Sequence, residues 1–587
     1  MLYKKLATLY EKLEGTSKRL EKTYYLSEFL KKTEKSDIEK IILLIQGRLF
    51  PPWDTKELGI AANLMVKTIS ISTGISLKKI KEEWKNTGDL GNVAQNKFSK
   101  KKQQSLFKKP LKVNKVFSNL RKLPDIEGKG AQDKKIQYIS ELLIQAEPLE
   151  AKYIVRTILS DLRIGIGQGT LRDAIAWAYF KEELNLKYKD GELEIDKEER
   201  EKYNDYLEKI QHAYNMTNEF SVVIKVIEKQ GIKGLDDIRL RVKTPVKMML
   251  FQKAENIDDA FETVGRPAAF EYKYDGFRIQ AHKDDKEVIL FTRRLEDVTR
   301  QFPEIVKYIN EYVNAKSAIF DCEVVGYDPQ TGNYLPFQSI SQRIKRKYDV
   351  KKLSKEYPVE VNVFDILFLD GISLLKEPFK KRRELLEKTI QEKPKQIVLA
   401  KQIITGDKDE AQEFYSESLK RGEEGMMAKN LSAEYKAGSR VGYGVKVKPV
   451  MEPLDLVIVK AEYGEGKRSG WLTSYTLACR DSSTGTLLEI GKVSTGLKEL
   501  KGNGVSFQQM TNLLKPLITK SSGKIVKIKP EIVIEVNYEE IQKSPTYSSG
   551  YALRFPRFSR LRQEKPLDEI NSLQDIKKLY KIQRGRL

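Results

Sequence analysis

The hydrophobic pattern of the chain changes its period near residue 240, and this change limits the possible folds more than any other feature. Before that point apolar residues recur at the spacing of one helix face, as in Ile38, Ile41, Ile42 and Ile45. Beyond it, runs such as EVILFTRR and AIFDCEVVGYD alternate apolar and polar residues, which is typical of half-buried strands. Another strand-rich stretch begins near residue 451 with LDLVIVKAEYGEG. Because 587 residues are too many for one hydrophobic core, we expect an α+β multidomain protein.

Local signals predict where several helices of the first 235 residues begin. The run SDIE at 36–39 has the pattern of a capping box, which predicts a helix start there. A second helix should open at Pro148 and run through EAKYIVRTILSDLR, and Thr170 with Asp173 can cap the next one. The glycine-rich turn GIGQG at 165–169 could hold a DNA phosphate at a helix N-terminus, or it could be an ordinary turn between helices.

Charge and rare residues narrow the function classes. Lys and Arg number 106 against 83 Asp and Glu, a formal charge of +23, which favours a polyanionic partner. The two cysteines, Cys322 and Cys479, exclude a multi-bridge disulfide framework and an all-cysteine zinc site. The two histidines are far apart, so hydrolases built on a catalytic histidine are poorly supported. No apolar run approaches the roughly 20 residues that span a bilayer, and we expect a cytoplasmic protein.

Lys273 is the centre of the chemistry that the sequence suggests. No phosphate loop of the Gly-x-x-x-x-Gly-Lys-Ser/Thr type occurs, so a nucleotide enzyme needs another device. Lys273 lies in the strand-like run EYKYDG, where alternation places Glu271 on the same face. Glu424 lies in EEGMMAK, and two lysines share a face in VKVK at 445–448. Taken singly, each of these is typical of a solvated strand.

Together, in this order and spacing, these motifs resemble the covalent nucleotidyltransferase superfamily, and within it the ATP-dependent DNA ligases of archaeal replicative type. The resemblance extends to TGDLG at 87–91, to AKYIVRTILSDLRIGIG at 151–167 and to the basic run RFPRFSR at 554–560. It implies a helical DNA-binding domain over 1–240, a mixed-sheet adenylation domain over 241–450 and an oligonucleotide-binding β-barrel over 451–587.

The resemblance also implies the roles of individual residues. Lys273 would accept AMP, Phe364 would stack on the adenine, and Glu323 with Glu424 would bind Mg²⁺, with Mn²⁺ also acceptable. The nucleotide site as a whole would comprise Glu271, Arg278, Arg293, Glu323, Phe364, Arg440, Lys446 and Lys448. An amine that attacks phosphorus must be neutral, and positive charge from the lysines and the metal would favour that form.

The sequence departs from the family pattern in three segments, which affects the assignment of individual residues there. Glu564 precedes Lys565 where family members usually carry aspartate, and Gly444 stands where a tryptophan is frequent. The segment SISQRIKRK at 339–347 is only partly the usual arginine run. None of these removes a catalytic group.

The expected partners are nicked duplex DNA, bound by a monomer, and a sliding clamp. Gln103, Leu106 and Phe107 of QQSLF resemble a short clamp-binding motif, although an ordinary exposed segment would read similarly. An RNA ligase or mRNA-capping enzyme would use the same lysine, and a non-catalytic DNA-binding scaffold is the rival from another class. ADP or NAD⁺ could also serve as donor.

Overall fold

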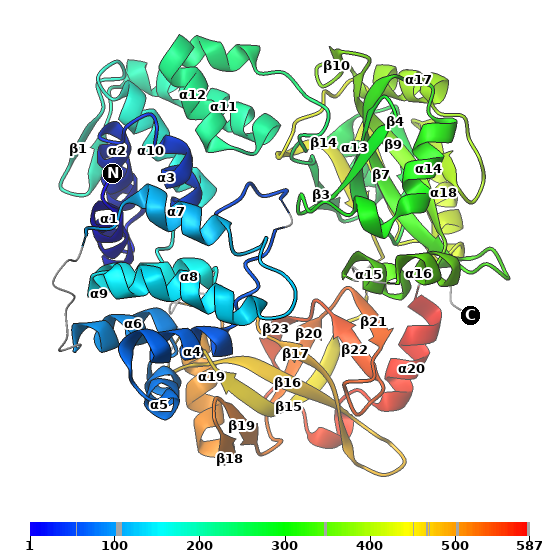
Figure 1. The fold of residues 1–587 in the computed structure, drawn as a ribbon. Coiled ribbons are helices and arrows are strands. Elements are labelled where there is room, and N and C mark those ends of the chain that lie inside the picture. Colours follow the sequence, from blue (N-terminus) through cyan, green and yellow to red (C-terminus); the bar gives the residue numbers. More distant parts are fainter. Residues whose placement is uncertain are drawn as a thin grey trace.

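The computed structural model describes residues 1–54, 56–100, 109–345, 349–449, 451–464, 468, 470–499 and 504–583. Helices fill the first part of the chain, two mixed sheets the middle and a curved sheet the last part, so the expected α+β architecture is confirmed. Figure 1 shows α1–α10 on one side, the sheets of β3–β14 on the other, and the strands after β15 below them. None of the helices in the described ranges combines the length and the apolar character needed to cross a membrane.

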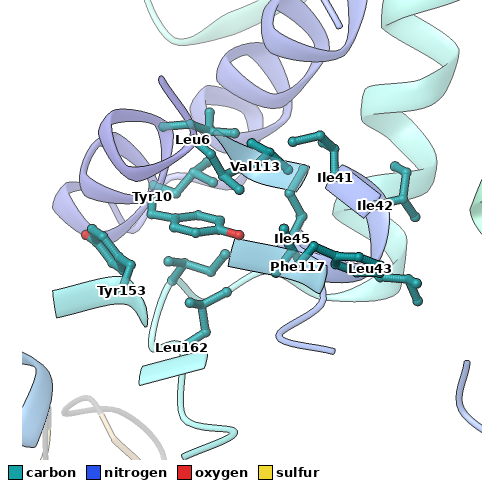
Figure 2. Packing of buried hydrophobic residues seen from close by; sticks show 14 of the residues in the cluster. Leu6, Tyr10, Ile41, Ile42, Leu43, Ile45, Val113, Phe117, Tyr153 and Leu162 are labelled. Atoms are coloured by element: carbon teal, nitrogen blue, oxygen red, sulfur yellow. The ribbon is translucent and has the colours of Figure 1, made fainter. Parts of the chain in front are cut away.

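The N-terminal helices pack around one extensive hydrophobic core. Figure 2 shows part of it, where Leu6 and Tyr10 meet Val113 and Phe117 from a helix distant in sequence. The helices are α1 Tyr3–Gly15, α2 Arg19–Lys31, α3 Ile38–Ile45, α4 Ala62–Thr73, α5 Leu77–Thr87, α6 Leu90–Ser99, α7 Val113–Arg121, α8 Ala131–Gln145, α9 Pro148–Ile158, α10 Gln168–Phe180, α11 Lys197–Thr217 and α12 Phe220–Gln230. A short hairpin, β1 Lys187–Lys189 and β2 Glu192–Glu194, and the 3₁₀ turn η1 Ile232–Asp237 complete this part.

Two predicted helix starts are wrong in detail. Helix α3 does begin at Ile38, but its N-cap is Asp37 in place of Ser36 and no side-chain cap hydrogen bond forms, so the predicted capping box is absent. Its carboxylate instead pairs with the N-terminal ammonium of Met1 at 2.7 Å. Helix α10 begins at Gln168 after Gly167, so Thr170 lies inside the helix and does not cap it. Tertiary contacts and backbone geometry decide these ends, which local pattern alone does not determine.

Arg156 joins three helices through a buried ion-pair network. Its guanidinium donates to Glu14 of α1 at 2.8 and 3.0 Å and to Asp89 Oδ2 at 2.5 and 3.1 Å. Asp89 also caps α6 by accepting from the amide of Gly91 at 2.8 Å. A Cβ on Gly91 would lie 2.6 Å from the Arg156 side chain, so glycine is needed where α6 approaches α9. The TGDLG motif is therefore a packing element of the helical core.

The middle of the chain forms two sheets. One has the order β10-β9-β7-β5-β6, with β8 and β11 added, and the other has the order β12-β4-β13-β14-β3. Parallel pairing of β14 with β3 and of β11 with β9 makes both sheets mixed. The strands are β3 Leu250–Ala254, β4 Ala268–Tyr272, β5 Phe277–Asp284, β6 Glu287–Thr292, β7 Ser317–Tyr327, β8 Tyr334–Leu335, β9 Val359–Leu369, β10 Ile372–Ser373, β11 Ile397–Leu399, β12 Gln402–Thr405, β13 Met426–Asn430 and β14 Arg440–Val447.

Helices cover these sheets, and each sheet packs with its helices around its own hydrophobic cluster. The helical elements are α13 Ile257–Val264, η2 Thr299–Gln301, α14 Pro303–Tyr312, α15 Phe337–Lys345, α16 Val350–Glu356, α17 Phe379–Thr389 and α18 Lys408–Lys420. Helix α13 packs on β13 and β14, and α18 packs on β4 and β12. The face of the five-stranded sheet that these helices leave open carries the polar residues described below.

The end of α11 is attached directly to the sheets. Met216 shares a hydrophobic cluster with Val246, Leu367 and other residues of the middle region. Two amides reinforce the attachment: Asn215 Nδ2 donates to the carbonyl of Ala437 at 2.7 Å, and Asn218 Nδ2 donates to that of Pro245 at 2.6 Å. The domain boundary predicted at residue 240 falls inside this shared cluster.

The last part of the chain is a curved antiparallel sheet around its own core. Strand β15 pairs with β16 on one edge and with both β19 and β20 on the other, which bends the sheet. Its elements are β15 Leu454–Tyr463, β16 Leu472–Arg480, β17 Leu487–Val493, α19 Phe507–Leu514, η4 Lys515–Leu517, β18 Ile518–Ser522, β19 Ile525–Ile528, β20 Val533–Asn537, β21 Glu540–Lys543, β22 Tyr551–Arg554, β23 Arg557–Leu561, η5 Leu567–Glu569 and α20 Leu573–Ile582.

Candidate active site

Lys273 directly follows β4 and is held by the chain that leads into β13. Its amide donates to the carbonyl of Gly425 at 2.9 Å, and its own carbonyl accepts from the amide of Glu424 at 2.9 Å. Gly276, three residues on, approaches β7 so closely that a Cβ would lie 2.3 Å from the Val324 carbonyl oxygen. The EYKYDG run therefore leaves its strand through a tightly packed turn, which fixes the direction of the lysine.

One carboxylate oxygen contacts two ammonium groups in this site. Glu424 Oε2 lies 2.5 Å from Lys273 Nζ and 2.7 Å from Lys448 Nζ. Burial by itself would raise the pKa of Glu424, but the two lysines outweigh it and hold that pKa well below its ordinary value. Burial lowers the pKa of Lys446, and the positive charges of Lys448 and Lys273 lower it further. The site thus concentrates positive charge around Lys273.

Strand register places a row of side chains beside Lys273 on the open face of the sheet. Met427 of β13 is the partner of both Glu271 on β4 and Lys446 on β14. Paired residues of neighbouring strands project to the same face. Lys446 and Lys448 also share this face, since they are two residues apart along the chain.

Glu271 forms a buried polar cluster at one end of this row. It is 2 % exposed, pairs with Lys429 Nζ at 2.5 Å and accepts from Gln402 Nε2 at 2.8 Å. The ammonium of Lys429 lies 4.8 Å from the ring centre of Phe364. These contacts orient both the carboxylate and the aromatic ring toward the same cavity.

Arg278 is fixed from several sides. It donates to both oxygens of the fully buried Asp321 at 3.0 and 2.5 Å, and to the Met249 carbonyl at 2.8 Å. Tyr435 donates to the same aspartate at 2.7 Å. The Arg278 guanidinium lies 5.2 Å from the ring centre of Phe364. Arg278 therefore supports the cavity wall, and its pKa is raised further because Asp321 stabilises the charge.

The predicted residues converge on one cavity of about 1200 Å³. Its lining includes every predicted site residue: Lys273, Glu271, Arg278, Arg293, Glu323, Phe364, Glu424, Arg440, Lys446 and Lys448. Arg293 and Arg440 are exposed. A cavity of this size accommodates a nucleotide with room for a second substrate.

Known proteins match the chain along its length. The family model "ATP dependent DNA ligase domain" matches residues 248–448, "DNA ligase N terminus" matches 2–176, and "ATP dependent DNA ligase C terminal region" matches 468–565. The DNA ligase of Nanoarchaeum equitans (strain Kin4-M) is 49% identical over 587 residues, which is 100% of this chain and 99% of that protein. The chain belongs to the family of ATP-dependent DNA ligases.

A second relative and a solved structure support the same family and fold. The DNA ligase of Thermococcus fumicolans is 41% identical to this ligase over 583 residues, covering 99% of each chain. A solved structure titled "Pmar-Lig_PreS3" is 15% identical, covers 95% of this chain and 99% of its own, and has a TM-score of 0.55, which supports the fold. The enzyme is therefore an ATP-dependent DNA ligase, as the sequence motifs predicted.

Two carboxylates of the ligase lie near the lysine, Glu323 from β7 and Glu424 from the segment before β13. Glu323, on β7, lies close enough to Lys273 and Glu424 for both charges to act on it. Loss of hydration raises the pKa of Glu323 to about 8; the negative charge of Glu424 adds to the rise, and the positive charge of Lys273 opposes it. Two carboxyl groups that repel one another in this way suit a shared cation.

Sequence reasoning missed several residues of the cavity. Met427 and Lys429 lie in the EEGMMAK motif, where the alternation that selects Glu271 and Lys446 could have identified Met427. The cavity also includes Arg554 and Phe555 of the basic run that the family resemblance indicated. The N-terminal segment adds Pro52, Asp54, Lys56 and Glu57, and the C-terminal region adds Glu539. No local pattern indicates these last five residues, because their contacts depend on how distant parts of the ligase meet.

The basic residues of the C-terminal stretch 554–565 lie in two places. Arg554 Nη1 lies 3.3 Å from Glu540 Oε2 and 3.7 Å from Glu424 Oε1, so it reaches the active site. Lys565 instead pairs with Asp455 at 2.6 Å, inside the C-terminal sheet. The departure noted at Gly444 has a local reason: a Cβ there would lie 2.4 Å from the ring of Phe251, which fills this space from β3.

Proposed function

We propose that this ligase stores AMP on Nζ of Lys273 and uses the surrounding residues to transfer it to a nick. The observation that carries the proposal is the placement of Lys273 against Glu424 and Lys448, at the wall of a cavity that Phe364 also lines. A lysine directed into a nucleotide-sized cavity and surrounded by cations is the arrangement that in-line attack on a phosphate requires.

The proposed ligation reaction runs in three steps. The Nζ lone pair of Lys273, after one ammonium proton has passed to solvent, bonds to the α-phosphorus of ATP. The bond to the bridging oxygen breaks with its electrons leaving on pyrophosphate, and the nitrogen loses a second proton to solvent. An oxygen of the 5′-phosphate at the nick then displaces lysine from AMP. Finally the 3′-hydroxyl, losing its proton, attacks that 5′-phosphorus and releases AMP, which forms the phosphodiester bond.

The residues that line the cavity can each be assigned to a part of the bound ATP. Phe364 presents its ring to the adenine, and the cluster around Glu271 offers hydrogen-bonding groups to the base edge. Arg278 holds the wall rigid through Asp321. The exposed Arg293 and Arg440 lie at the cavity surface, where a ribose hydroxyl or a nick phosphate can reach them. Lys446 and Lys448 contact the triphosphate.

Glu323 and Glu424 are the residues that would hold Mg²⁺. Mg²⁺ typically takes one or two protein carboxylates and completes its shell with water and substrate phosphates. Across the described ranges no group of three or more His, Cys, Asp and Glu residues gathers into a metal-binding cluster. When bound, the ion would supply charge neutralisation to the phosphates, and Mn²⁺ would suit the same oxygens.

The DNA and protein partners form the second part of the proposal. The ligase would act in the cytoplasm as a monomer that grips nicked duplex DNA, with division into domains 1–240, 241–450 and 451–587. Separate hydrophobic clusters support three units, with Met216 and Leu240 packed into the cluster of the middle unit. The clamp-binding residues Gln103, Leu106 and Phe107 lie outside the described residues and remain a proposal from the sequence. Phe107→Ala should weaken clamp binding without changing clamp-independent sealing, and equal loss of both would count against it.

The decisive experiment follows the label of α-³²P-ATP. Wild type and Lys273→Ala are incubated with labelled ATP and Mg²⁺, then denatured or supplied with nicked duplex DNA. We expect label to remain on the denatured wild type, to be absent from the variant, and to leave the protein as the nick is sealed. Label on Lys273→Ala equal to wild type would assign the nucleophile elsewhere.

A further inference from the structure

A second cavity, of about 940 Å³, adjoins the active-site cavity. The two share part of their lining: Glu424, Lys446, Lys448, Glu539, Arg554 and Phe555. Lys273 lines only the first cavity, and Lys253 lines only the second. The cationic wall that contacts Lys273 on one side therefore faces another space on its other side, between the five-stranded sheet and the C-terminal strands.

Lys253 extends the row of cations across the sheet. It lies on β3, where parallel pairing makes it the direct partner of Lys446 on β14. Neighbouring strands are about 4.8 Å apart, so two ammonium groups in this register can contact one phosphate group. The opposite faces of the same strands carry Ala254 and Val447, which are buried in the hydrophobic cluster below.

The charges around Lys253 leave it available for an anion. It is exposed, and among the ion pairs of the described residues it takes no part. The carboxylates nearest the shared wall are already paired: Glu539 lies 3.3 Å from Lys448, and Glu540 lies 3.3 Å from Arg554. Glu452 and Asp575 also line this cavity, but neither forms an ion pair with Lys253, so among the described residues its ammonium group has no carboxylate within salt-bridge distance.

We propose that Lys253 binds the β- and γ-phosphates of ATP and then the departing pyrophosphate, in the second cavity. The proposal rests on Lys273 as the AMP acceptor. In-line displacement at the α-phosphorus sends the leaving group away from Lys273 Nζ. With the adenine beside Phe364, the polyphosphate passes Lys446 and Lys448 and reaches Lys253. Lys253 contacts the leaving group, while the bond that breaks and the electrons that move are those of the Lys273 reaction.

The test separates adenylation from sealing. Lys253→Ala, Lys253→Arg and a control, Lys388→Ala, are compared with wild type. Lys388 is an exposed lysine of α17 that lines neither cavity, so its removal changes net charge equally. Three quantities are measured: the KM for ATP in enzyme–AMP formation, the pyrophosphate concentration that half-reverses a preformed enzyme–AMP, and the rate of sealing a pre-adenylated nick without ATP.

We expect Lys253→Ala to raise the KM for ATP about tenfold, which is the typical effect of losing one charge-assisted phosphate contact. The half-reversing pyrophosphate concentration should rise by a similar factor, because both ligands use the same contact. Sealing of the pre-adenylated nick should stay at the wild-type rate, and Lys253→Arg should restore most of both losses.

Two outcomes would overturn the proposal. An unchanged KM together with unchanged pyrophosphate reversal would remove Lys253 from the phosphate path. An equal loss in sealing of the pre-adenylated nick, or a lowered thermal midpoint, would make Lys253 a DNA contact or a structural residue. Failure of the AMP-acceptor assignment looks different, since Lys273→Ala would then still form enzyme–AMP.

Discussion

Replacing Arg156 by methionine should destabilise the helical part of the ligase while leaving adenylation intact. Methionine keeps much of the aliphatic volume but removes the guanidinium, which is 2 % exposed and joins α9 to Glu14 and Asp89. Asp89 would then keep the Gly91 amide and a distant contact with Arg163 at 3.9 Å. Leaving one partner of a buried pair costs on the order of 3–5 kcal/mol.

That loss is measurable as a shift of the helical unfolding transition. A destabilisation of this size in a domain of some 240 residues lowers its midpoint by roughly 10 °C. Calorimetry, with circular dichroism of the helices, would follow it. Arg163→Met is the matched control, because Arg163 is 37% exposed and its pairs are worth under about 1 kcal/mol. Covalent AMP formation should match wild type in both variants, since Lys273 lies in the sheets.

The same ion-pair network should make the stability of the helical part fall as the pH is lowered. Burial opposes ionisation of Glu14, but hydrogen bonds from Arg156, Lys152 and Tyr153 lower its pKa from 4.5 to about 2. A depressed carboxyl pKa contributes stability above pH 4.5, and that stability is lost as the pH falls toward 2. Arg156→Met should flatten this decline. A variant that loses less than about 1 kcal/mol, or keeps the wild-type acid slope, would refute the reasoning.

Three further predictions concern other parts of the chain. Gly444→Ala should destabilise the sheets by about 1–3 kcal/mol, because its Cβ meets the Phe251 ring, and Phe251→Leu should recover part of the loss in a denaturation series. Burial lowers the pKa of His282 from 6.5 to about 3, so stability is lost as the pH falls from 6.5 toward 3; an imidazole titrating near 6.5 by NMR would contradict this. Burial raises the pKa of Cys479 to about 11 and that of Cys322 further, so iodoacetamide at pH 8 should label both thiols only after denaturation.

The sequence predicted site residues that depend on local strand structure, but it did not predict contacts between segments distant in sequence. Glu271 and Lys446 were predictable because strand alternation fixes their faces. Lys273 and Lys448 lie just beyond the ends of their strands and were identified through the family resemblance. Arg554 could be recognised as part of a basic run, but its approach to Glu424 depends on how the C-terminal sheet meets the adenylation sheets.

Three other features could not be predicted because they also depend on contacts between segments distant in sequence. The capping box at 36–39 failed because the helix begins after Asp37 and not after Ser36, and the Asp37 carboxylate is bound by the N-terminal ammonium, 36 residues away in sequence. The place of Gly444 becomes clear only when Phe251, on a neighbouring parallel strand, is seen to fill the space beside it. No sequence pattern indicates that Lys429 is buried, because its place depends on the pairing with Glu271 of β4.

The attachment of α11 to the sheets makes this helix a lever. Its 21 residues span about 30 Å at 1.5 Å per residue. Its anchored end is fixed by Asn215 and Asn218, and along its length Tyr203 accepts a hydrogen bond from Trp177 of α10 at 3.0 Å. A rotation of about 5° at the anchor would displace the far end by roughly 3 Å. Small adjustments of the sheets around a nucleotide would therefore be magnified into larger movements of the helices.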